Sequence, residues 1–284
     1  MAIKRVGIVG SGIMGSGVAE AAAKAGHEVV LRSRKKESAD AMVAALEKSL
    51  AKQVEKGKLS DDDAKSTASR VSATAHLGDL ANCDLVLESV VEDLAVKKEL
   101  FNDLDQVCDD HTILATNTST LPVIELAMVT SRPDKVCGVH FFNPATVMAL
   151  VEIVRPLTAS DDTIASARAF AEACGKTPVE VKDQAGFIVN ALLFPYLNNA
   201  VRLLENAVAN RDDIDTAMKG GCGFPMGPLA LLDLVGLDTS LAIIDALYDE
   251  FRDPNYAAVP TLRRMVAAGR LGRKSGQGFH DYRK

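Results

Sequence analysis

The fold is decided by the stretch Val6-Gly7-Ile8-Val9-Gly10-Ser11-Gly12-Ile13-Met14-Gly15, an apolar run followed by glycines in the spacing G-x-G-x-x-G. An alanine-rich segment, 16–25, follows and ends at Gly26, so the pattern predicts a strand, a tight turn and a helix. Such glycines permit the turn, let the backbone approach a pyrophosphate and let the helix pack closely on the strand. We therefore predict a dinucleotide site made by Gly10, Gly12, Ile13, Met14 and Gly15, rather than a ligand-free turn.

The end of the second predicted strand bears on which dinucleotide is bound. An NAD site of this kind carries Asp or Glu about 20 residues after the glycines, where it holds the ribose hydroxyls. Here the sequence reads Leu31-Arg32-Ser33-Arg34 and has no acid. Ser33 does not repel a 2′-phosphate and Arg34 can pair with one, but the arginines can equally stack on the adenine or face solvent. NAD and NADP therefore both remain candidate cofactors.

The remaining sequence has two parts that differ in their pattern of apolar residues. Apolar runs rich in β-branched residues alternate with helical patterns up to about residue 180, at 28–31, 83–88, 112–115 and 136–142. This alternation predicts a parallel sheet covered by helices, and segment 38–58 with Ser60 as a following N-cap predicts an inserted helix pair. After Gln184-Ala185-Gly186 the pattern is helical. We predict an α/β, Rossmann-type dinucleotide-binding domain, 1–184, followed by an all-α domain, 185–284.

Composition excludes several classes of protein. The 284 residues carry a net charge of −6, which argues against a nucleic-acid partner because phosphate backbones are bound by a basic excess. No apolar run approaches the ~20 residues that cross a bilayer, and the N-terminus has no signal-peptide pattern. The cysteines show no metal-ligand spacing, and we expect reduced thiols, no metal and a cytoplasmic protein. They are Cys83, Cys108, Cys137, Cys174 and Cys222.

A histidine follows the last apolar run. The segment Val139-His140-Phe141-Phe142-Asn143-Pro144 predicts a strand with His140 at its end, a turn, and a second strand that ends at Glu152. A carboxylate bonded to one imidazole nitrogen fixes the tautomer and leaves the other nitrogen as a base near neutral pH. A single histidine beside phenylalanines is more often a packed core residue. The catalytic interpretation of His140 therefore depends on the other motifs in the chain.

Five motifs in order give the chain a resemblance to the 3-hydroxyacyl-CoA dehydrogenases, and among these to bacterial 3-hydroxybutyryl-CoA dehydrogenases. The resemblance spans essentially the whole chain. Its motifs are Gly10 to Gly15, Asn117-Thr118-Ser119, His140-Phe141-Phe142-Asn143-Pro144 with Glu152, Gly186-Phe187-Ile188-Val189-Asn190, and Leu271-Gly272-Arg273-Lys274-Ser275-Gly276.

The resemblance implies reversible hydride transfer between a nicotinamide cofactor and C3 of a short 3-hydroxyacyl-CoA, in fatty acid or butanoate metabolism. It implies that His140 is the general base, that Glu152 orients it, and that Ser119 and Asn190 contact the substrate oxygens. Asn117-Thr118-Ser119 is also a common turn composition, and Asn190 can cap a helix. The helical domain would bind the acyl-CoA and form a homodimer.

The resemblance also implies an outer shell of contacts. Lys48, Lys52 and Lys56 are four residues apart and share one helix face, where Lys52 and Lys56 would hold coenzyme A phosphates; a solvated face is the alternative. Ala191 departs from the family, which commonly has Arg there. Two other functions remain alternatives. One is a β-hydroxyacid or sugar-acid dehydrogenase, which uses a lysine base, and the other is a non-catalytic dinucleotide-binding or structural relative. In addition to Ser119, the residues that the resemblance implies as cofactor contacts are Glu92, Lys97, Asn143 and Lys274. For the two lysines, the alternative is a solvated surface charge.

Overall fold

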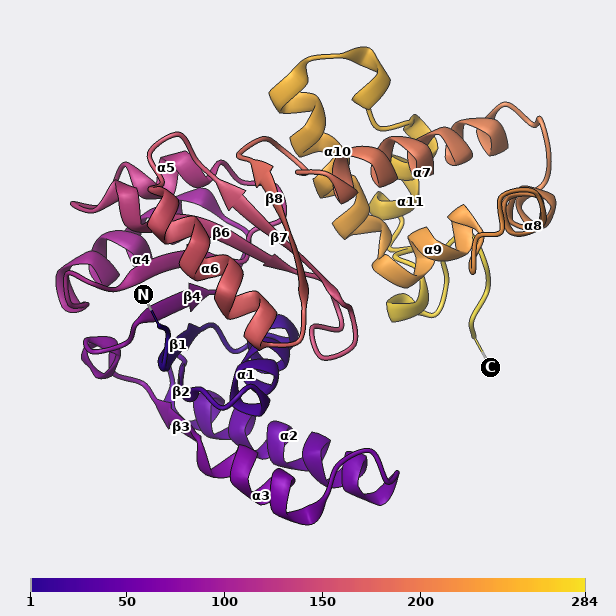
Figure 1. Cartoon of the computed structure of the whole chain (residues 1–284). Coiled ribbons are helices and arrows are strands. Elements are labelled where there is room, and N and C mark those ends of the chain that lie inside the picture. Colours follow the sequence, from indigo (N-terminus) through magenta and orange to yellow (C-terminus); the bar gives the residue numbers. More distant parts are fainter. Residues whose placement is uncertain (1, 284) are drawn as a thin grey trace. The chain divides into compact units, whose positions relative to one another are not determined.

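The computed structural model describes residues 2–283, which form two compact units. The first unit ends at Asp183 and the second begins at Gln184. Figure 1 shows strands and helices mixed in the first unit and helices alone in the second. The predicted class, a Rossmann-type domain with an inserted helix pair followed by a helical domain, is confirmed.

The first unit is built on one sheet of eight strands in the order β3-β2-β1-β4-β5-β6-β7-β8. The first six strands pair in parallel, as the apolar runs predict, but β7 is antiparallel to β6. The apolar pattern missed β3 and β8 because few of their residues are fully buried, one in β3 and none in β8. The strands are β1 (Arg5–Val9), β2 (Glu28–Arg32), β3 (Val71–Thr74), β4 (Leu85–Glu88), β5 (Ile113–Thr116), β6 (Val136–Phe141), β7 (Leu150–Arg155) and β8 (Thr177–Lys182).

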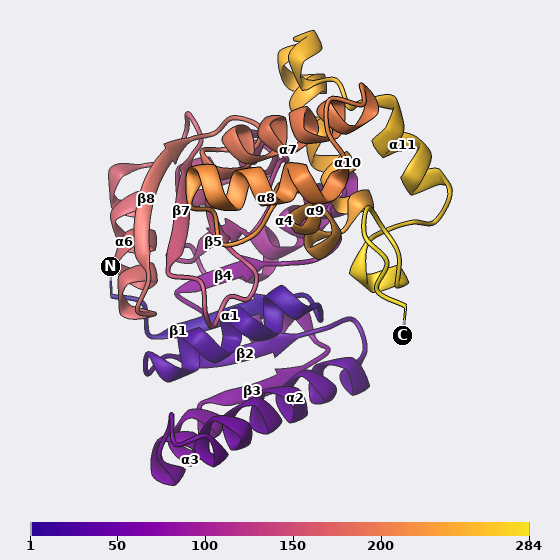
Figure 2. The same cartoon turned by 90° about the vertical axis from the view of Figure 1, so that its right-hand side faces the viewer.

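Helices cover both faces of this sheet. Figure 2 shows α1 along β1 and β2, and α2 beside β3, and apolar side chains of α1, α2 and α6 share one core with the sheet. The predicted inserted pair is α2 and α3, and Ser60 caps α3 as expected, with its Oγ 3.1 Å from the Asp63 nitrogen. These helices are α1 (Ile13–Lys24), α2 (Lys36–Glu55), α3 (Asp61–Ser69), α4 (Leu94–Val107), α5 (Val123–Ala127) and α6 (Asp161–Ala173).

The strand order brings the candidate functional residues together at one edge of the sheet. Going outward from the middle of the sheet, the chain adds strands on one side from β1 to β3 and on the other side from β4 onward, so the switch point lies between β1 and β4. In parallel sheets, ligands bind at such a switch point, beyond the carboxyl ends of the strands. The glycine-rich turn leaves β1 at this edge, Glu88 ends β4, Thr116 ends β5 and His140 lies one residue before the end of β6. Segments far apart in sequence therefore converge on one edge of the sheet.

The second unit is a helical domain with its own apolar core. Its C-terminal tail is fixed by Asp233, which is fully buried and accepts hydrogen bonds from the backbone nitrogens of Phe279 and His280, both at 2.8 Å. Within residues 2–283, no helix combines the length and apolar character that a membrane span requires. The helices are α7 (Val189–Glu205), α8 (Arg211–Cys222), α9 (Pro228–Val235), α10 (Leu237–Phe251) and α11 (Pro260–Ala267).

We predict that Asp233→Ala destabilises this unit by roughly 2–5 kcal/mol, because two buried backbone donors lose their acceptor. The chain has no tryptophan and all 4 tyrosines lie beyond residue 184, so tyrosine fluorescence during urea unfolding reports on this unit alone. Asp249→Ala, which removes an exposed carboxylate of α10, is the control. Equal unfolding midpoints for the two variants would contradict the anchoring role of Asp233.

Candidate active site

The glycine-rich turn fits a dinucleotide. Gly10 has a φ of +128°, and a Cβ there would lie 2.2 Å from the Ser89 carbonyl oxygen, while one at Gly15 would lie 2.5 Å from the Gly10 oxygen. These two glycines are needed for close backbone packing. Gly12 differs, because a Cβ there meets nothing within 4 Å and the residue opens α1 without a side-chain cap. The open space at a helix N-terminus suits a pyrophosphate, beside the exposed Ile13.

The end of β2 is positively charged. Ser33 is buried and donates its backbone N–H to the Thr74 carbonyl at 3.1 Å, while Arg34 and Lys35 are exposed. Burial, with the nearby charge of Arg34 as the second cause, lowers the pKa of Arg32. The buried Arg32 Nε has no hydrogen-bond partner within the described residues. The end of β2 therefore offers cations, and no carboxylate at the position where an NAD site carries one.

The predicted histidine–carboxylate pair is present. His140 and Glu152 are directly opposite in the antiparallel β6–β7 pair, and His140 Nδ1 lies 2.8 Å from Glu152 Oε2. Both side chains are at least 95% buried. Glu152 lies in the middle of β7, so the expectation that this strand ends there is wrong by three residues. A carboxylate accepts only, so the Nδ1–H donates to it and Nε2 is the nitrogen available for proton transfer.

Ser119 completes this arrangement. It follows β5, and its Oγ lies 3.1 Å from His140 Nε2. The same nitrogen and hydroxyl can together hold a substrate oxygen and exchange its proton. Ser119, predicted from one motif, and His140 with Glu152, predicted from another, are therefore brought together by three different strands or strand ends of the first unit.

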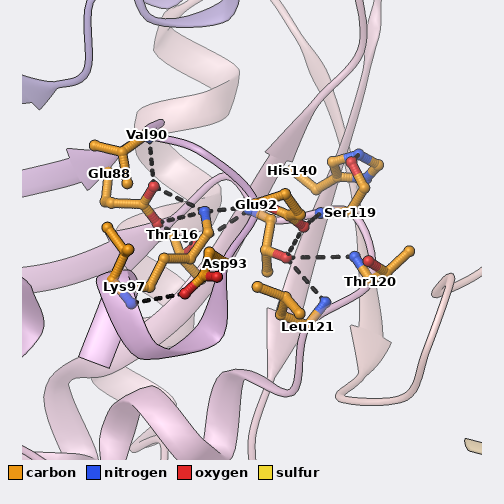
Figure 3. A network of polar contacts seen from close by, with 12 residues as sticks. Glu88, Val90, Glu92, Asp93, Lys97, Thr116, Ser119, Thr120, Leu121 and His140 are labelled. Atoms are coloured by element: carbon orange, nitrogen blue, oxygen red, sulfur yellow. Dashed lines mark hydrogen bonds and ion pairs between the residues drawn. The ribbon is translucent and has the colours of Figure 1, made fainter. Parts of the chain in front are cut away.

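A charged network lies next to Ser119, as Figure 3 shows. Glu92 Oε1 accepts hydrogen bonds from the Ser119 backbone nitrogen, at 3.0 Å, and from the Thr118 hydroxyl. Its other oxygen lies 3.1 Å from Lys97 Nζ. Lys97 is 1% exposed, so the alternative that it is a solvated surface charge is wrong. Its Nζ lies 2.8 Å from both carboxylate oxygens of Glu88.

Sequence reasoning missed Glu88. Its available signal was an acidic residue closing an otherwise apolar run, Leu85–Glu88, nine positions before a lysine on the following helix. Because buried carboxylates are almost always paired, that lysine was the natural partner to look for.

The other predicted residues are more scattered. Asn143 is exposed just after β6. Lys52 on α2 and Lys56 at its C-cap are exposed, in keeping with either coenzyme A binding or a solvated face. In the second unit, Asn190 is buried in the first turn of α7, and Lys274 is half-exposed with Nζ 2.7 Å from Asp238 Oδ2. The functional roles of these five residues stay predictions.

Comparisons with known proteins show the family to which the chain belongs. Residues 5–184 match the family model described as "3-hydroxyacyl-CoA dehydrogenase, NAD binding domain", and 186–282 match "3-hydroxyacyl-CoA dehydrogenase, C-terminal domain". The chain is 46% identical to a 3-hydroxybutyryl-CoA dehydrogenase of Clostridioides difficile, over 99% of this chain and 100% of that one. It is 46% identical to a probable 3-hydroxybutyryl-CoA dehydrogenase of Bacillus subtilis, covering 99% and 98%. The crystal structure of (S)-3-hydroxybutyryl-CoA dehydrogenase from Ralstonia eutropha superposes with a TM-score of 0.97, at 42% identity and full coverage of both chains.

The glycine-rich turn allows a paired prediction. Gly10→Ala should destabilise the first unit as well as weaken dinucleotide binding, because its Cβ meets the backbone at a positive φ. Gly12→Ala should leave the unfolding temperature within about 2 °C of wild type but weaken binding at least tenfold, because its methyl group fills the space for the pyrophosphate. Differential scanning calorimetry and isothermal titration with NADH and NADPH measure both effects. Full binding by a folded Gly12→Ala would exclude the turn as the pyrophosphate site.

Proposed function

The chain belongs to the 3-hydroxyacyl-CoA dehydrogenase family, and from that premise we propose that it interconverts 3-hydroxybutyryl-CoA and acetoacetyl-CoA with a nicotinamide cofactor. The observation that carries the proposal is the row Ser119–His140–Glu152, with His140 Nε2 facing the serine hydroxyl and Nδ1 bound to the carboxylate. The short acyl chain is proposed because the relatives above are named for 3-hydroxybutyryl-CoA.

In the proposed reaction, His140 acts as the general base and the general acid. In the oxidation, its Nε2 takes the proton of the 3-hydroxyl group, and in the reduction the imidazolium returns a proton to the same oxygen. A bound nicotinamide would supply the hydride chemistry at C3. Glu152 stabilises the imidazolium and holds the ring in one tautomer, and its burial prevents water from taking its place. Ser119 Oγ donates to the same substrate oxygen and fixes its position.

The parts of the substrate away from its reacting C3 atom are held by other side chains. We assign the coenzyme A phosphates to Lys52 and Lys56, whose exposed ammonium groups are at the end of α2. Asn190 would contact the acyl oxygens, and Asn143, Glu92, Lys97 and Lys274 would line the cofactor region directly or through neighbours. Homodimerisation through the second unit is also proposed. It is supported by exposed apolar side chains on its helices and loops, at Leu192, Leu203, Val208 and Phe224.

We further propose that the cofactor used is NADP(H). The support is the β2 end, where Ser33 replaces a carboxylate and Arg34 is exposed beside Lys35. A guanidinium binds phosphate oxygens bidentately, whereas an acid at position 33 would repel a 2′-phosphate. The uncapped N-terminus of α2, which begins at Lys36, adds a favourable dipole for an anion.

For the reaction itself, we expect wild-type enzyme to reduce acetoacetyl-CoA at near-neutral pH, followed at the nicotinamide absorbance. His140→Ala should lower kcat by roughly 10²–10⁴, because the proton donor is lost. Glu152→Gln should lower kcat by roughly 10² or more, because a glutamine amide can favour the wrong tautomer. His111→Ala, at a partly exposed histidine of the same unit, is the matched control. Wild-type protein that binds dinucleotide but reduces no acetoacetyl-CoA would overturn the proposed substrate.

For the cofactor, we expect kcat/KM with NADPH to exceed that with NADH. Arg34→Gln should raise the KM for NADPH roughly tenfold and leave the KM for NADH almost unchanged, since only the 2′-phosphate contact is lost. Ser33→Asp should reverse the preference. Lys58→Gln, an exposed cation beyond α2, controls for the change in net charge. A wild-type preference for NADH, or equal effects of Arg34→Gln and Lys58→Gln, would refute this assignment.

A further inference from the structure

We propose that Glu88 is a positioning residue of the reaction, which holds Ser119 in register with His140 through Lys97 and Glu92. The inference rests on the proposed function, because it assigns to a buried group an effect on the proton-transfer site. Glu88 touches neither Ser119 nor His140 in the contacts of Figure 3, so its action is through the two intervening side chains.

Glu88 is held by three donor groups. It ends β4 between β1 and β5, is fully buried, and receives Lys97 Nζ at 2.8 Å on both oxygens. The Val90 backbone N–H and the Thr116 hydroxyl donate to it at 2.5 and 2.7 Å. A buried carboxylate with all these donors is rigid, because any rotation leaves a donor or a charge without its partner.

Lys97 transmits this rigidity outward. It lies in the second turn of α4 with 1% of its side chain exposed, and its ammonium also lies 3.1 Å from Glu92 Oε2. One cation therefore joins two carboxylates, the inner one fully buried and the outer one 40% exposed. An exposed glutamate on a loop does not hold one rotamer by itself. Its fixed position comes from the buried ammonium, whose own position comes from Glu88.

Glu92 in turn holds the loop that follows β5. Its Oε1 accepts from the Ser119 N–H at 3.0 Å and from the Thr118 hydroxyl, and that hydroxyl accepts from the Leu121 N–H at 2.9 Å. The network thus fixes the backbone on both sides of Ser119, whose Oγ lies 3.1 Å from His140 Nε2. A shift of the loop by a fraction of an ångström would break that contact.

The test is a double-mutant cycle on purified full-length enzyme. Glu88→Gln keeps the shape but removes the charge that fixes Lys97, and should lower kcat for acetoacetyl-CoA reduction roughly tenfold to a hundredfold. In a Ser119→Ala background the same change should cost less than about twofold, because the hydroxyl that it positions is already absent. A purely structural role would lower kcat by the same factor in both backgrounds.

The control is Asp105→Asn on the same helix. Asp105 forms a largely buried ion pair with Arg132, at 2.7 Å, and also accepts from the Ser131 N–H, but these contacts do not reach the Ser119 network. Its effect on kcat should be small and equal in both backgrounds. If Glu88→Gln does not fold, Glu88→Gln with Lys97→Met removes both charges together, leaves no unpaired buried ion, and should show the same coupling to Ser119.

The two proposals fail in different ways. Wild-type enzyme that does not reduce acetoacetyl-CoA refutes the proposed function. Wild-type turnover combined with a Glu88→Gln effect that is additive with Ser119→Ala, or no larger than that of Asp105→Asn, refutes the positioning role and leaves the function intact. The positioning role is supported if the effect of Glu88→Gln depends on Ser119 and the effect of Asp105→Asn does not.

Discussion

The cross-strand hydrogen bond between His140 and Glu152 is the contact on which the chemistry depends. It exists because β7 runs antiparallel to β6, which places two buried side chains directly opposite each other on one face of the sheet. A parallel strand at this point would need a long crossover and would give a different register. The departure from a purely parallel sheet is therefore what supplies the histidine with its carboxylate.

The other half of the site comes from the parallel strands. Because β1, β4, β5 and β6 run in one direction, their carboxyl ends meet at one edge of the sheet. The glycine-rich turn, Glu88, the loop to Ser119 and His140 are each supplied by a different strand end. Each of these strands is anchored by buried apolar residues, so the core places the strand ends, and polar contacts then fix the side chains at those ends.

Local patterns account for what could be predicted from sequence. The glycine spacing, the apolar runs and the cap at Ser60 act over a few residues, so they identified β1, the main parallel strands and the helix pair α2–α3. Strands β3 and β8 lie at the two edges of the sheet, and their partly exposed, polar sequences carry no such signal. Ser119, His140 and Glu152 were recognised through family motifs, whereas their distances depend on strand pairing. For Lys97, the sequence left a solvated surface charge open as the alternative to a cofactor contact, because burial is a tertiary property.

The Glu88–Lys97–Glu92 network explains why this fold tolerates buried charge beside its reactive groups. Replacing such a network by apolar residues is often neutral or favourable for stability, so stability alone is a weak reason to keep it. A fully bonded polar network offers something that apolar packing does not, because it fixes direction as well as distance. Thr116 and Val90 satisfy the inner carboxylate, and Ser119 and Thr118 satisfy the outer one. The serine hydroxyl and the imidazole act together only if their 3.1 Å separation is kept, and the directional bonds of this network end at that serine.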